Sequence, residues 1–312
     1  SWSWRWIFYL NVPISIVCIL AAWHYIPKDR ADFTTPPRFD FRGFILSGLS
    51  LTGVMFGVEL FSKPAVALWI PFVLIFVSFV LLRINVKDSA RVRTPLIDYA
   101  IMKIKTYRIT ILVGSVSRML IGVFPYLMPL MLQEGFGLSP FKAGSLFLAT
   151  MVGNLTMKSA IIRHYPFRRV LIVNGILTAL FLFITAWLTP DTPVWMILLV
   201  LFVTGMSRSL QFSTLTALAF ADIPPHQMTS ANTLYSTIQQ MSIGMGVAIG
   251  AVALHFSSLL HHGTLGHFTV FDFRLSFIVV AIIGIVHLIG YTRLPLHAGM
   301  SVRIKKSHNL GD

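Results

Sequence analysis

Acidic side chains are scarce in this sequence: Asp and Glu supply 11 of 312 residues, against 25 from Lys and Arg. Charged residues together make up 12% of the chain, about half the share of an average soluble domain. Hydrophobic residue types reach 55%, which is more apolar surface than a soluble protein of this length could bury. The composition therefore excludes a soluble domain and predicts an all-α, polytopic membrane helix bundle.

Cysteine is almost absent as well, since Cys18 stands alone. A single thiol cannot form an internal disulfide and gives no metal-site spacing. Three histidines, His261, His262 and His267, gather in the loop 257–271. No Cys or carboxylate joins them at the spacing of zinc ligands, so we interpret them as solvated loop residues. We predict no metal site and no cofactor.

Long apolar runs, by contrast, fill the chain. A membrane-spanning helix needs about 20 mostly apolar residues, and nine runs have that length. They are residues 6–26, 43–61, 65–82, 109–132, 141–162, 169–189, 194–220, 230–256 and 273–294. An odd number of spans predicts that the two ends of the chain lie on opposite sides of the bilayer.

Lys and Arg are concentrated in alternate loops between these runs. Eighteen fall on one side and four on the other, while Arg118, Lys158 and Arg208 lie within runs. Because cytoplasmic loops carry the excess of basic residues, we predict an external N-terminal end and a cytoplasmic C-terminal end for this chain. The formal charge of +14 is thus a topology signal. It does not form the basic face of a nucleic-acid-binding protein.

Two arginines are predicted near the middle of the bilayer. Arg118 lies about ten residues into its run and Arg208 about fourteen into its own. An α-helix rises 1.5 Å per residue, which places both near the middle of the bilayer. A charge at that depth is paired, hydrated or functional, and the residues alone leave a ligand role and structural pairing open. Among the acids only Glu59 falls within a run, near its outer end, so no deep carboxylate is predicted for proton coupling.

The last six runs can be divided into two sets of three. Arg118 belongs to the first run of one set and Arg208 to the first run of the other, in helices of opposite direction. Two oppositely oriented three-helix sets are typical of inverted-repeat transporters. Between the central runs and these six, residues 95–107 have the pattern of an amphipathic helix at the anionic inner leaflet.

Several stretches resemble the fourteen-span drug:proton antiporters of the major facilitator superfamily, the EmrB/QacA type. They are WRWIFYLNVP (4–13), RFDFRGFILSGLSLTGVMFGVEL (38–60), FPYLMPLMLQEGFGLSPFKAG (124–144) and SLQFSTLTALAFADIPPHQMTSANTLYSTIQQMSIGMGVAIGA (209–251). Arg118, Met157-Lys158 and FRRVL (167–171) are similar to the MdtD-type branch. The resemblance covers essentially the whole chain. It implies a part of the family's fold from the sixth helix onward, without the five helices that hold the family's transmembrane acid and antiporter motif.

This resemblance implies a division of the chain into six segments. They are the last helix of an N-terminal bundle (1–26), a cytoplasmic linker (27–42), two central helices (43–82), a cytoplasmic basic segment (83–108), a C-terminal six-helix bundle (109–295) and a cytoplasmic tail (296–312). IIRHYPFRRV (161–170) is similar to the family's gating loop but lacks its usual Asp. That absence weakens a gating role for the loop.

The implied function is that of a secondary active transporter fragment, not an enzyme, in the bacterial inner membrane. It would export amphiphilic compounds or drugs by alternating access, with protons, the lipid bilayer and the missing N-terminal helices as partners. The candidate cavity residues are Arg118, Phe124, Tyr126, Met128, Arg208, Gln211, Asn232 and Gln239. Two alternatives are a non-transporting membrane scaffold or sensor, and an integral-membrane transferase whose only acid/base candidates are His255 and His261.

Overall fold

The computed structural model describes residues 6–25, 39–61, 63, 66–92, 95–157, 165–262 and 268–295. Their regular secondary structure is helical, and every apolar run predicted from the sequence contains a helix. The chain divides into two units, Ser1–Phe39 and Asp40–Asp312, which we describe separately. The first unit holds α1 (Trp6–Tyr25), an apolar helix that includes Pro13, as membrane helices tolerate.

The second unit holds the remaining helices. They are α2 (Phe41–Leu60), α3 (Trp69–Ser89), η1 (Tyr99–Lys103), α4 (Lys105–Leu130) with its π-helical extension η2 (Met131–Gly135), α5 (Pro140–Thr156), α7 (Phe167–Ala186), α8 (Val194–Ala221), η3 (Pro225–Gln227), α9 (Met228–His262), α10 (Val270–Val286) and α11 (Leu288–Thr292). Within the described part of the chain, seven helical segments are long and apolar enough to cross a membrane. This confirms a polytopic helix bundle, while α1 and α5 stay predicted spans.

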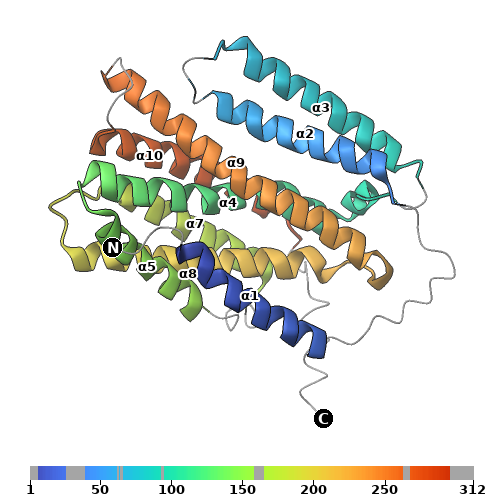
Figure 1. Ribbon diagram of the computed structural model, residues 1–312, viewed down its shortest axis with the longest axis horizontal. Helices are drawn as coiled ribbons and strands as arrows, with labels where there is room; N and C mark the ends of the chain where they lie inside the picture. Colours follow the sequence, from blue (N-terminus) through green and yellow to red (C-terminus); the bar gives the residue numbers. More distant parts are fainter. Residues whose placement is uncertain are drawn as a thin grey trace. The chain divides into compact units, whose positions relative to one another are not determined.

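Helices α4 to α10 pack in pairs, and each pair combines one helix from each of the two predicted sets of three. The first helix of one set, α4, lies along α9, the second helix of the other set. In the same way α5 lies along α8, and the third helices, α7 and α10, pack on each other. Figure 1 shows α4 beside α9 and α5 beside α8. A pseudo-two-fold axis between inverted repeats requires this pairing of each helix with a helix of the other set.

Glycine sets the close approach in two of these pairs. A Cβ on Gly122 of α4 would overlap with the carbonyl oxygen of Ile243 on α9, and one on Gly246 would overlap with that of Met119. The α5–α8 pair repeats the arrangement, because a Cβ on Gly153 or Gly205 would meet the backbone of the partner helix. Small residues of this kind let membrane helices approach to backbone contact.

The hairpin of α2 and α3 lies beside α9 (Figure 1). Its buried Asn85 donates to Ser47 Oγ at 2.8 Å and to the Tyr99 hydroxyl at 3.0 Å. Ser89 Oγ donates to the Ile97 carbonyl at 2.6 Å. Burial raises the pKa of Tyr99, an effect that its hydrogen bonds partly offset. The first of these bonds joins α3 to α2, and the bonds to Tyr99 and Ile97 attach the hairpin to the segment that precedes α4.

That segment differs from the surface helix that the sequence predicted for residues 95–107. It forms the short 3₁₀ helix η1 and then an extended residue, Ile104, before α4 begins. Ile97 and Ile101 are buried in one hydrophobic cluster with Tyr107 and Tyr235. The apolar side chains pack on α4 and α9 and are thereby removed from the bilayer surface. Helix α3 also extends to Ser89, seven residues beyond the predicted span.

Candidate functional site

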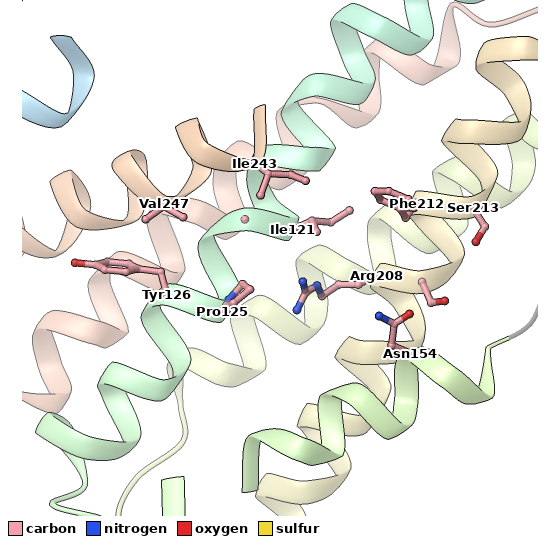
Figure 2. Close-up of a pocket in the computed structure, with 11 residues that line it drawn as sticks. Ile121, Pro125, Tyr126, Asn154, Arg208, Phe212, Ser213, Ile243 and Val247 are labelled. Atoms are coloured by element: carbon pink, nitrogen blue, oxygen red, sulfur yellow. The ribbon is translucent and has the colours of Figure 1, made fainter. Parts of the chain in front are cut away.

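An open cleft of about 730 Å³ lies between α4, α5, α8 and α9. Its volume is within the range of about 300–1,000 Å³ for ligand pockets. The lining residues are Ile121, Gly122, Pro125 and Tyr126 of α4, Asn154 of α5, Arg208, Ser209, Phe212 and Ser213 of α8, and Ile243 and Val247 of α9. Figure 2 shows them converging from their helices. Both helix pairs, α4 with α9 and α5 with α8, therefore contribute to the wall of the cleft.

Helical geometry explains which side chains reach the cleft. On α8 the lining positions follow the spacing i, i+1, i+4 and i+5 from Arg208, and on α4 they follow the same spacing from Ile121. Residues at this spacing share one face of a helix. The two lining residues of α9, Ile243 and Val247, are four apart. Each helix thus turns one narrow face toward the cleft.

Arg208 carries the only charge among the described residues that line the cleft. Its side chain projects from α8 toward Pro125 of α4, with Asn154 of α5 beside it (Figure 2). Its Nε atom is buried and has no hydrogen-bond partner within the described chain. A cation with an unsatisfied buried donor, on the wall of an open cleft, is available to an anionic group.

A hydrogen-bonded cluster lies behind the cleft, inside the bundle. Asn174 donates through Nδ2 to Gln211 Oε1 at 2.8 Å and to the Ser207 carbonyl at 2.9 Å. Gln211 Nε2 donates to Ser117 Oγ at 3.2 Å and to the Tyr291 hydroxyl at 3.3 Å. These bonds join α4, α7, α8 and α11. Gln211, 3% exposed, therefore has a cross-linking position behind the cleft wall.

Arg118 lies in a different environment from Arg208. It is 1% exposed and is absent from the residues that line the cleft. Its guanidinium carbon lies 4.7 Å from the ring centroid of Tyr235 on α9. Nη1 donates to the Thr110 carbonyl at 3.4 Å, while Nε and Nη2 have no partner in the described part of the chain. The structure thus encloses this charge between α4 and α9.

The other candidates from the sequence are distributed over three places. Tyr126 lines the cleft, but Phe124 and Met128 belong to the hydrophobic core. The Phe124 ring packs 6.2 Å from that of Phe277, between centroids. Asn232 is exposed on α9, and Gln239 of the same helix is half-buried with an unpartnered Oε1. A role of these residues in substrate binding stays a prediction.

A family model of the Major Facilitator Superfamily matches residues 1–248. The chain belongs to the major facilitator superfamily. It is 32% identical over 265 residues to a protein of Pectobacterium carotovorum subsp. carotovorum that is provisionally named multidrug resistance protein MdtD, covering 83% of this chain and 56% of the relative. Proteins with the same provisional name match from Pectobacterium atrosepticum, at 28% identity over 94% of the chain and 63% of the relative, and from an Enterobacter strain, at 29% over 97% and 64%.

These matches confirm the resemblance to MdtD-type members of the superfamily that the sequence indicated. Members of the superfamily are transporters, so this chain is a multi-pass membrane transporter component and not an enzyme. The chain spans 56–64% of the length of these three relatives.

Most cleft residues were not among the candidates from the sequence. The missed residues are Ile121, Gly122, Pro125, Asn154, Ser209, Phe212, Ser213, Ile243 and Val247. Helical spacing could have found six of them, because Ser209, Phe212 and Ser213 share a helix face with Arg208, and Ile121, Gly122 and Pro125 share one with Tyr126. The residues of α5 and α9 depend on the pairing of helices, which the sequence pattern alone does not give.

No carboxylate of the described chain is among the residues that line the cleft. Asp272 is buried at the start of α10, where it accepts from the Thr269 backbone N–H and hydroxyl at 2.8 Å each. Glu59 of α2 forms an ion pair with Lys63 at 3.0 Å. Among the residues that the structure describes, no group of three metal-ligating side chains gathers. The chemistry available at the cleft is therefore binding by one cation, polar donors and apolar surface.

Proposed function

We propose that the chain is the C-terminal part, from the sixth helix onward, of a secondary active transporter that exports small amphiphilic compounds, drugs among them. Transport would be coupled to protons and would proceed by alternating access. The observation that carries the proposal is the cleft of about 730 Å³ on a bundle in which helices of the two three-helix sets pack in pairs. A transporter of this architecture binds its substrate between two such bundles, near the middle of the membrane.

The composition of the cleft wall supports an amphiphilic substrate. Apolar surface comes from Ile121, Phe212, Ile243 and Val247, while Arg208 adds a charge. Binding sites for small molecules combine mostly apolar walls with a few polar groups that orient the ligand. The proton-carrying group of this proposal would lie in the N-terminal helices of the intact protein, since no carboxylate of the described chain lines the cleft.

We further propose a location in the bacterial inner membrane, with the N-terminal end of this chain outside and its C-terminal end in the cytoplasm. The excess of eighteen Lys and Arg over four on alternate sides supports this orientation. The bacterial origin of the relatives supports the membrane. A cytoplasm-dependent fluorescent protein fused after the last residue should fluoresce. An alkaline phosphatase fused at the same position should be inactive, and the reverse result would invert the topology.

Efflux by the intact protein tests the function. We expect cells that lack their own drug exporters to accumulate less of a fluorescent amphiphilic dye when they express the intact protein. An uncoupler that dissipates the proton gradient should restore accumulation. Arg118→Ala and Arg208→Ala should both lower export while the protein still inserts into the membrane. Equal accumulation in expressing and non-expressing cells, over a panel of anionic, neutral and cationic dyes, would favour the scaffold alternative.

A further inference from the structure

The polar groups of the cleft share a chemical property: each can donate a hydrogen bond, and none is a carboxylate. Beside the guanidinium of Arg208 they comprise the amide of Asn154 and the hydroxyls of Ser213 and Tyr126. The hydroxyl of Ser209 also lines the cleft, but it donates to the Met157 carbonyl at 3.3 Å. Guanidinium nitrogens are donors only, whereas amides and hydroxyls can donate or accept. A wall of this kind is complementary to an oxygen anion.

The charge of Arg208 has no compensating partner among the described residues. Its Nε is buried without a hydrogen bond, and no carboxylate of the described chain lines the cleft. A partly buried charge is costly unless it is paired and hydrogen-bonded. The planar guanidinium accepts a carboxylate as a bidentate partner, which satisfies two donors at once. An anionic ligand group would therefore compensate the charge of Arg208.

The apolar residues lie at a suitable position for the rest of such a ligand. Figure 2 shows Ile121 on one side of Arg208, and Phe212 farther along α8. Ile243 and Val247 extend the apolar wall on α9. A volume of about 730 Å³ accommodates a compound of drug size beside the charged group.

We propose that the cleft binds an amphiphilic organic carboxylate. The carboxylate pairs with Arg208 and accepts from the Asn154 amide, while the apolar body contacts Ile121, Phe212 and the α9 wall. This inference rests on the proposed transport function and names its substrate class. It excludes organic cations as the preferred ligands of this wall, because Arg208 repels them and the described cleft has no acid to attract them.

Three probes with one ring system test the charge preference: 1-naphthoate, 1-naphthamide and 1-naphthylmethylammonium. Binding to the purified intact protein is measured by titration in nanodiscs of phosphatidylcholine, which carries no net charge. A charge-assisted hydrogen bond contributes about 1.5–3 kcal/mol. We therefore expect naphthoate to bind at least about tenfold more tightly than the amide, and the ammonium probe to bind most weakly.

Substitutions then assign the preference to one side chain. Arg208→Gln should bring the affinity for naphthoate down to that for naphthamide, and Arg208→Lys should keep part of the difference. Arg293→Gln removes the same charge from an exposed position outside the cleft and should change none of the three affinities. Equal binding of the three probes to the unsubstituted protein, or an Arg208→Gln variant that keeps the tenfold preference, would overturn the proposal.

Two further results separate this inference from the transport function and from lipid binding. Arg208-dependent naphthoate binding without any efflux would retain the carboxylate site and contradict the exporter. Efflux of neutral and cationic dyes with no role for the Arg208 charge would do the opposite. Displacement of naphthoate by phosphatidylglycerol in the nanodisc, lost in Arg208→Gln, would assign the anion to a lipid headgroup and overturn a solute carboxylate.

Discussion

Arg118 and Arg208 begin from equivalent places in the sequence and end in contrasting environments. Each lies in the first helix of its three-helix set, near mid-bilayer by residue count. Yet Arg118 is enclosed between α4 and α9 over the ring of Tyr235, while Arg208 lies on the wall of an open cleft. Depth in the membrane therefore does not determine whether a charge is available to a ligand.

Helix direction accounts for much of the difference. Side chains in an α-helix lean toward the helix N-terminus, and α4 and α8 are antiparallel. Arg118 accordingly extends back along α4 and donates to Thr110, eight residues earlier. Arg208 extends the opposite way, toward Pro125 and Asn154 (Figure 2). The first arginine is directed into the packed end of the bundle and the second into the space between the helix pairs.

The largest effect should come from separating α4 and α9, which enclose Arg118. A valine at Gly246 would overlap with the backbone of Met119, and a main chain cannot move aside as a flexible side chain can. We expect Gly246→Val to cost more than about 3 kcal/mol, since overpacking of a tight contact costs 1–3 kcal/mol and sometimes more. Thermal unfolding in detergent, followed by tryptophan fluorescence, measures it.

Gly144→Val is the matched control for that experiment. Gly144 lies on α5 with no atom within 4 Å of an added Cβ, so the same substitution there should leave the unfolding temperature nearly unchanged. Equal losses in the two variants would show that the α4–α9 contact is looser than the glycine geometry indicates.

A smaller effect should follow from removing the ring beneath Arg118. Tyr235→Leu takes away the cation–π partner, whose contribution reaches about 2 kcal/mol when the pair is desolvated. Tyr235→Phe keeps the ring and loses only the hydrogen bond with the Thr216 hydroxyl at 2.8 Å, worth about 1 kcal/mol. Chemical unfolding should therefore rank the variants wild type, Phe, Leu in falling stability.

A double-mutant cycle makes this prediction specific to the charge. In an Arg118→Met background the ring has no cation to stabilise, so the difference between Leu and Phe at Tyr235 should shrink. If that difference is unchanged in the Arg118→Met background, Tyr235 acts by packing alone.

The sequence predicted the class of fold well and the cleft only in part. The thickness of the bilayer sets the length and apolarity that a spanning helix needs, so such runs can be recognised in the sequence. All nine of them contain a helix. Arg208 was predictable because hydrocarbon tolerates a charge only for a reason. Met128, by contrast, is an apolar residue that would suit a cleft wall as well as the core. The structure places it in the core, where it is 0% exposed. Only the helix rotation and pairing distinguish the two.

The two arginines should differ when each is replaced by methionine. Arg118→Met removes a buried charge that lacks a carboxylate in the described chain, and because an unpaired buried charge is costly, we expect the substitution to leave the stability unchanged or to raise it. Arg208→Met, on the open cleft, should change the stability by less than about 0.5 kcal/mol. Unfolding of both variants side by side measures the contrast. A loss above about 2 kcal/mol in Arg118→Met would instead identify that arginine as a structural cross-link.

The smallest expected effect is on the rate at which charged reagents reach the two regions. In a Cys18→Ser background, Ser213→Cys places a thiol on the cleft and Ser117→Cys one in the interior, where Ser117 is 3% exposed. The first thiol should react with methanethiosulfonate reagents and the second should not react in the folded protein. Arg208 should favour the anionic reagent over the cationic one at the cleft thiol, speeding the first and slowing the second by roughly fivefold each, because a charge a few ångströms away in a wet site contributes about 1 kcal/mol. Arg208→Gln should remove that preference and Arg118→Met should leave it intact. A preference that instead depends on Arg118 would reverse the assignment of the two arginines.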